Sequence, residues 1–218
     1  MHKLLGIDSP LMGALMKIGD ILCLSALWLV FSLPVLTIGA SSAALYAAVH
    51  HCLRRGGSGI WNSFWNAFRE NFRRSTLAWL IELAVLAVFA LDAAVFRSIL
   101  LSGGAMGKLY WAALLLEAVG FTWTAYVAAY AARFNGSVGE ILRYGFLLLR
   151  LHPILALRVL VPITAGLALC LMVPFMVLFA PAGVCWICSF TLERIFRLHM
   201  QPEDLEKENA RDALDRPE

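Results

Sequence analysis

The feature that most constrains this chain is its long apolar segments. From Ile18 to Val49 the sequence is almost unbroken apolar. One straight helix over that stretch would be about 50 Å long at about 1.5 Å per residue, whereas the hydrocarbon core of a bilayer is only about 30 Å thick. This run is typical of a membrane protein whose chain crosses the bilayer, turns and crosses again.

The composition of the whole chain agrees with this interpretation. Of its 218 residues, 61% are hydrophobic and 15% are charged. Soluble domains contain roughly 45–50% apolar and about 25% charged residues. The composition therefore indicates an integral membrane protein and excludes a soluble enzyme, a disordered chain and a small disulfide scaffold.

The pattern of apolar runs predicts an all-α, polytopic transmembrane helical bundle in residues 1–200. Pro34 and Gly39 break the first run, so we expect two helices joined by a tight turn there. A single tilted and kinked crossing is the alternative, and it lowers the count of spans from six to five. The six predicted spans are 18–33, 40–54, 75–101, 105–132, 153–173 and 179–197.

Short amphipathic segments are expected at the membrane surface. Residues 1–17 form one of them, because Asp8-Ser9-Pro10 is a typical helix start. Residues 54–74 and 133–152 are basic linkers between spans. The first linker places Trp and Phe residues opposite asparagines and arginines, a pattern that suits lipid headgroups, so we expect its aromatic rings at the inner interface or against the bundle. Nucleic acid is not an expected partner, since the segment is held between spans.

The distribution of charge predicts the orientation. The tail from Gln201 to Glu218 has seven acidic and three basic residues, so residues 1–200 carry a net charge of +7. With six spans, both basic linkers lie on the same side as both termini, which the positive-inside rule makes cytoplasmic. We therefore expect a multi-pass protein of the plasma membrane with an acidic cytoplasmic tail. Asp8 and Asp20 interrupt the early sequence, so no cleavable signal is expected and the first apolar segment stays as an anchor.

A weak internal similarity is also present. The stretch from Leu45-Tyr46-Ala47-Ala48 through Arg54-Arg55 to Phe68 is echoed by Ala125-Tyr126-Val127-Ala128, Arg133 and Phe146. Transporters are often built from repeats, but helices with basic ends also resemble one another by physical constraint. Both explanations stay open.

Charged side chains inside apolar segments are costly, so each is a candidate functional residue. A proton or cation site at Glu82 and Glu117 is one interpretation. Interhelical ion pairs, such as Glu82 with Arg158, are the interpretation that we favour. The five candidates are Glu82, Asp92, Arg97, Glu117 and Arg158.

Other motifs carry little chemistry. Cys185-Trp186-Ile187-Cys188 lies in an apolar helix, where cysteine is commonly a packed residue. His50 and His51 are adjacent on a helix, so their side chains point about 100° apart and are not expected to share a metal ion. No Walker loop, nucleophile elbow or His-Glu-x-x-His motif is present in the sequence. We therefore predict no catalytic site, cofactor or metal, and a function other than that of an enzyme.

Several sequence blocks resemble the YesL family of small bacterial membrane proteins, whose molecular function is not established. They are Asp8–Met12, Leu33–Ala40 with Ala44–Tyr46, Phe64–Phe72 and Leu192–Phe196. The resemblance covers about residues 1–200 and implies a context of carbohydrate uptake or sensing, but it supplies no catalytic residues.

Two classes of function are expected from these observations. The first is an accessory or regulatory protein that contacts a sugar ABC permease or a sensor kinase. The alternative is a small-solute transporter or channel subunit that uses intramembrane carboxylates.

Overall fold

The structure is a computed structural model, and it describes residues 10–200 together with residues 205 and 206. No strand occurs in these residues, so the prediction of an all-helical fold is confirmed for them. The α-helices are α1 (Pro10–Ser32), α2 (Ile38–Ala48), α3 (Ile60–Leu101), α4 (Leu109–Arg133), α5 (Val138–Leu151), α6 (Pro153–Met172) and α7 (Ala180–His199). Short helical turns join them: η1 (Val35–Thr37), η2 (Val49–Arg54), η3 (Ala105–Lys108) and η4 (Pro174–Leu178).

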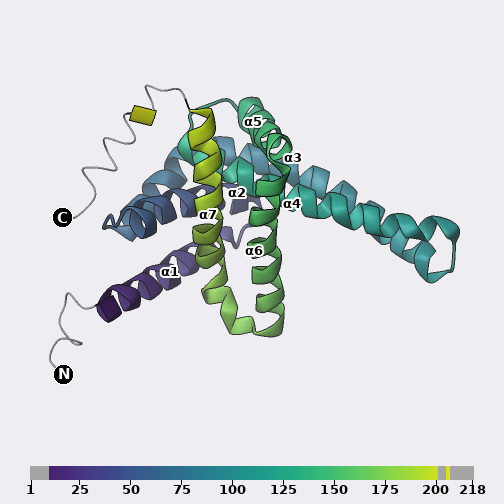
Figure 1. Cartoon of the computed structure of the whole chain (residues 1–218), viewed down its shortest axis with the longest axis horizontal. Helices are drawn as coiled ribbons and strands as arrows, with labels where there is room; N and C mark the ends of the chain where they lie inside the picture. Colours follow the sequence, from purple (N-terminus) through teal and green to yellow (C-terminus); the bar gives the residue numbers. More distant parts are fainter. Residues whose placement is uncertain (1–9, 201–204, 207–218) are drawn as a thin grey trace.

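The helices meet in one central region, from which three projections leave in different directions (Figure 1). One projection is the hairpin of α3 and α4, the second is the hairpin of α6 and α7, and the third is α1. The short helix α2 lies in the centre. Eight of its eleven residues are buried, and its residues take part in all three apolar clusters of the core.

Helices α2 and α3 pack closely because α2 consists mainly of small residues, which allow a neighbouring helix to approach. Gly39 shows how closely. A Cβ added to it would lie 2.4 Å from the Cβ of Trp79 and 2.5 Å from the carbonyl oxygen of Ser75, both in α3. The contact between α2 and α3 therefore has no room for a larger side chain at this position.

The turn predicted at Pro34 is present. Helix α1 ends at Ser32 and η1 leads directly into α2. The hydroxyl of Thr37 donates to the carbonyl oxygens of Phe31 and Pro34 at 2.6 and 2.8 Å, and Ser32 Oγ lies 2.6 Å from Ser41 Oγ. These bonds satisfy polar groups that the break in the helix would otherwise leave unpaired.

Two predicted boundaries between surface helices and spans are wrong. Residues 10–17 do not form a separate surface helix, because α1 continues unbroken to Ser32; residues 1–9 lie outside the described part. Residues 60–74 of the first linker and the span 75–101 likewise form the single helix α3 of 42 residues. The physical reason is the absence of proline between Ile60 and Leu101.

The second linker does end in a break, as predicted. Helix α5 starts with a capping box in which Ser137 and Glu140 exchange side-chain and backbone hydrogen bonds, and it ends at Leu151. Pro153 then starts α6. The two halves of the suggested repeat therefore differ at this point, because proline separates the linker helix from the span only in the second half.

The aromatic face of the first linker packs partly as expected. Phe64 and Phe68 are buried, and the ring of Phe31 from α1 lies 5.5 and 5.0 Å from their centroids. Trp65 is partly buried, whereas Trp61 is 55% exposed. The face therefore holds α1 against the start of α3 and leaves Trp61 at the edge.

Five helical segments of the described part are long and apolar enough to cross a membrane: Gly13–Ser32, Val35–Arg54, Ile60–Leu101, Ala105–Arg133 and Pro153–Met172. The first two are separate candidates, which agrees with the prediction of two helices rather than one kinked crossing. Helix α7 forms at the predicted place but is not among the five, because Glu193, Arg194 and Arg197 lie in it. A sixth crossing by α7 stays a prediction.

Candidate ligand site

A cavity of about 550 Å³ lies in the central region, and it is partly enclosed. Helices α2, α3, α4, α6 and α7 line it, together with Trp28 of α1 and Val177 of η4. Its surface is mostly apolar; Leu45, Val127 and Ile163 are examples. Its volume lies within the range of about 300–1,000 Å³ that is usual for small-molecule sites in proteins.

Most polar side chains of the cavity wall have hydrogen-bond partners. The indole N–H of Trp28 donates to Ser42 Oγ at 3.1 Å, and that of Trp79 donates to the carbonyl oxygen of Val35 at 2.8 Å. Thr124 donates to the carbonyl oxygen of Phe121 at 2.8 Å. These groups are satisfied within the wall and stabilise its shape.

Glu82 and Ser75 differ from the other polar residues of the wall. Glu82 is 2% exposed and its Oε1 has no hydrogen-bond partner, and Ser75 is 4% exposed with its Oγ also unpartnered. They are seven residues apart on α3, which places them two turns apart on the same face of the helix. Both line the cavity, so the cavity presents two buried polar groups that no protein atom satisfies.

The position of Glu82 follows from the pattern of α3. The buried residues of this helix recur at spacings of three or four for most of its length, as on the inner stripe of an amphipathic helix. They are Phe64, Phe68, Asn71, Ser75, Ala78, Glu82, Leu86 and Ala93. Glu82 therefore lies on the packed stripe and not on the lipid-facing side.

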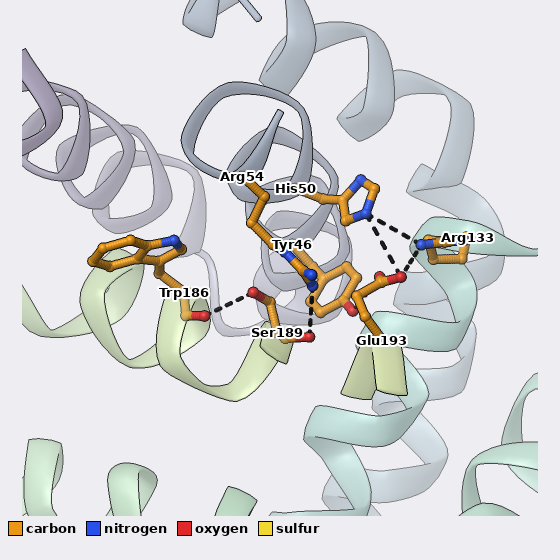
Figure 2. Close-up of polar contacts among 7 residues, drawn as sticks. All are labelled: Tyr46, His50, Arg54, Arg133, Trp186, Ser189 and Glu193. Atoms are coloured by element: carbon orange, nitrogen blue, oxygen red, sulfur yellow. Dashed lines mark hydrogen bonds and ion pairs between the residues drawn. The ribbon is translucent and has the colours of Figure 1, made fainter. Parts of the chain in front are cut away.

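A polar network adjoins the cavity (Figure 2). Glu193 of α7 is 2% exposed and lies at its centre. Tyr46 Oη donates to Glu193 Oε1 at 2.7 Å, and Arg133 Nη1 donates to Glu193 Oε2. His50 Nε2 lies 3.6 Å from the same oxygen and 3.2 Å from Arg133 Nη1. The network joins α2, η2, α4 and α7 at one point.

A second contact in Figure 2 joins η2 to α7. Arg54 Nη1 donates to the carbonyl oxygen of Ser189 at 2.9 Å, and its guanidinium lies 4.9 Å from the ring centroid of Phe190. The hydroxyl of Ser189 donates to the carbonyl oxygen of Trp186 at 2.7 Å. The π-helical turn η2 thus directs both His50 and Arg54 towards α7; such turns are frequent at functional sites.

Tyr46 connects the cavity and the network. It is 3% exposed, lines the cavity, and donates its hydroxyl hydrogen to Glu193. Leu192, the residue before Glu193, lines the cavity as well. The network therefore adjoins the cavity wall at Tyr46.

Only one of the five predicted candidates lies in the cavity, and that residue is Glu82. Asp92, Arg97 and Arg158 are exposed, and Glu117 is half-buried outside the cavity. The predicted ion pair between Glu82 and Arg158 is wrong, because Arg158 is exposed on α6 while Glu82 is enclosed on the inner face of α3. The buried carboxylate that does form an ion pair is Glu193.

The histidine and cysteine residues of the two motifs lie next to other protein groups. His51 Nδ1 lies 3.2 Å from Ser63 Oγ, whereas His50 faces Glu193, so the two rings diverge as predicted. Cys185 and Cys188 are both free, and Cys188 Sγ contacts the carbonyl oxygen of Val159 at 3.6 Å. Within the described ranges, no group of three or more His, Cys, Asp or Glu residues lies where it could hold one metal ion.

The role of Glu193 was not predicted from the sequence. The sequence does contain a pointer to it, because Glu193 follows the apolar stretch of α7 and lies in the block Leu192–Phe196. Its partner Tyr46 lies in another block that resembles the YesL family, Ala44–Tyr46. The pairing of Glu193 with Arg133 and His50 could not be predicted, since 60 and 143 residues separate them in the chain.

Helical segments long and apolar enough to cross a bilayer, arranged around a core, define a helical membrane protein. Residues 21–93 are similar to a family described as "Protein of unknown function, DUF624". This match covers α2, η2, about half of α1 and most of α3, and it includes Tyr46, His50 and Glu82. No curated protein and no solved structure matches the chain.

Proposed function

We propose that this protein is an accessory or regulatory component of a larger assembly in the plasma membrane. The proposal rests on two carboxyl groups of the projecting hairpin, those of Asp92 and Glu117. In the part of the chain that the structure describes, neither forms a hydrogen bond or an ion pair, and neither lies in the core.

The two carboxyl groups lie at the same depth. Asp92 is nine residues from the end of α3 at Leu101, and Glu117 is eight residues from the start of α4 at Leu109. At about 1.5 Å per residue, both are about 12–14 Å from the ends of their helices next to the tip of the hairpin. That distance is close to half the thickness of a hydrocarbon core of about 30 Å.

Ionisable side chains at that depth are costly unless they pair. The outer half of the hairpin projects away from the other helices (Figure 1), so no other described helix supplies a partner there. We therefore propose that the hairpin docks against a helix of another membrane protein, and that this helix brings a Lys, an Arg or a hydrogen-bond donor to the carboxyl groups.

The carbohydrate context is part of the proposal. The resemblance of the sequence blocks to the YesL family supports a partner that takes part in sugar uptake or sensing, namely a sugar ABC permease or a sensor kinase. The mostly apolar cavity does not resemble a sugar site, which favours an accessory role over sugar binding by this chain.

Co-purification from native membranes in mild detergent tests the docking proposal. The double variant D92N/E117Q keeps the shape of both side chains and removes their charge. We expect about tenfold less of the partner with the double variant than with the original chain, as for the loss of one or two charge-assisted hydrogen bonds. The matched control is R158Q, which removes an exposed charge on α6. Equal recovery of the partner with all three chains would contradict the proposal.

Transport of a small solute is the second candidate function, and the cavity with Glu82 supports it. Flux of a labelled solute into liposomes that depends on the protein and is abolished by E82Q would favour transport. Flux that is absent, or that E82Q leaves unchanged, would count against it.

A further inference from the structure

We infer that the central cavity binds an amphiphile with a long apolar body and a positively charged amine head, and that the head pairs with Glu82. The inference is independent of the proposed docking of the hairpin, because the cavity lies in the core and the docking residues lie on the projection.

The lining of the cavity specifies the body of the ligand. Its wall consists mainly of aliphatic and aromatic side chains contributed by five helices, and its polar groups except Glu82 and Ser75 are satisfied within the wall or the adjoining network. An alkyl chain can occupy such a space without leaving any polar group unpaired. A sugar would leave most of its hydroxyl groups without partners there.

Charge specifies the head group. Among the described Asp, Glu, Lys, Arg and His residues, only Glu82 lines the cavity. No described Lys or Arg lies in the wall to receive a phosphate or a carboxylate. A cationic amine provides both a compensating charge and N–H donors for the unpartnered Oε1.

Neighbouring groups favour the same head. Ser75 Oγ is also unpartnered, and it lies two helical turns from Glu82, so it offers the ligand a separate hydrogen-bonding group in the same wall. The rings of Trp28, Trp79 and Phe121 line the cavity, and aromatic faces attract ammonium groups. An amine therefore finds a charge partner, an acceptor and aromatic walls in one cavity.

Photolabelling of the full chain tests the inference. The protein is reconstituted in phosphatidylcholine nanodiscs with a photoreactive long-chain primary amine, and the labelled residues are mapped by mass spectrometry. Competitors are the unlabelled amine, the alcohol of equal chain length and a short-chain amine. We expect labels on cavity residues such as Leu45, Val127 or Ile163, displaced by the long-chain amine at concentrations about tenfold lower than by the alcohol, as for one charge-assisted hydrogen bond.

The competitors separate a membrane amphiphile from a water-soluble amine. Displacement by the long-chain amine but not by the short-chain amine supports an amphiphile that enters from the bilayer. Equal displacement by the short-chain amine would overturn the apolar body, and equal displacement by the alcohol would overturn the charged head. Absence of label from the cavity would overturn the inference as a whole.

Variants connect the binding to Glu82. In E82Q we expect the preference for amine over alcohol to disappear, while E70Q, which changes an exposed carboxyl on the same helix, keeps it. A preference that survives in E82Q would contradict the inference. If E82Q does not fold, the comparison of amine with alcohol in the original chain still decides the outcome.

Discussion

Glu82 and Glu193 are equally buried but have opposite surroundings. Each is 2% exposed. Glu193 has a cation, a histidine and a tyrosine hydroxyl around it, whereas Glu82 Oε1 has no partner. A buried carboxylate stabilises a fold only where its charge is compensated. We therefore assign Glu193 a structural role and Glu82 a role in ligand binding.

Glu193→Gln is expected to destabilise the protein. The change leaves Arg133 and His50 beside a neutral amide, and breaking a buried ion pair costs about 3 kcal/mol or more. The melting temperature in detergent measures the effect, and it should fall clearly below that of the original chain. E70Q on the exposed face of α3 serves as the control and should melt as the original chain does. A melting temperature of E193Q equal to that of E70Q would show that the network does not stabilise the fold.

Glu82 and Arg158 are expected to act independently. Because the two side chains form no ion pair, the free energies of unfolding in a double-mutant cycle of E82Q and R158Q should add to within about 0.5 kcal/mol. Chemical denaturation in detergent measures all four chains. A coupling energy of more than about 1 kcal/mol would restore the ion pair that the sequence suggested.

The helices themselves were largely predictable. Proline lies at three of the six breaks between the α-helices: Pro34 ends the first run, Pro153 separates α5 from α6, and Pro174 starts the turn η4. The continuity of α1 and α3 was not predicted, because a change from polar to apolar composition along the sequence resembles a boundary between two helices. A change of environment along a helix does not by itself break its backbone hydrogen bonds.

Gly39→Ala tests the close contact between α2 and α3. The added Cβ would lie 2.4 Å from the Cβ of Trp79 and 2.5 Å from a backbone oxygen, so the helices must move apart. We expect a loss of about 1–3 kcal/mol in the free energy of unfolding, as is typical of overpacking.

Gly183→Ala is the matched control on α7. A Cβ added there meets no atom within 4 Å, and alanine is a better helix former than glycine by up to about 1 kcal/mol. This variant should be as stable as the original chain or more so. If both variants have equal stability in detergent, the packing at Gly39 is looser than the structure describes.

At the scale of the whole molecule, the apolar runs predicted a membrane protein but not the arrangement of its helices. The cavity forms where five helices meet, and the divergence of the two hairpins depends on contacts between residues far apart in the chain (Figure 1). Periodicity on one helix identifies its inner face, as for Glu82 on α3, but not what that face contacts. The candidate site was therefore predictable as one residue and not as a cavity.

Orientation in the membrane is a further prediction at this scale. Reporter fusions at Met1 and Glu218 should both report the cytoplasm, because the basic linkers lie on the side of both termini if α7 crosses the bilayer. An external reporter at Glu218 with an internal one at Met1 would show that α7 does not cross. An external reporter at Met1 would contradict the orientation of the whole bundle.

Site-specific photocrosslinking in intact cells tests the central claim, the docking of the α3–α4 hairpin. A photoreactive residue at Leu116, which is 51% exposed beside Glu117, is compared with one at Leu157, which is 57% exposed on α6 beside Arg158. We predict a crosslink to one other membrane protein from position 116 that D92N weakens severalfold, and no such crosslink from position 157. Equal crosslinking from both positions, or a crosslink from position 116 that D92N leaves unchanged, would contradict the account.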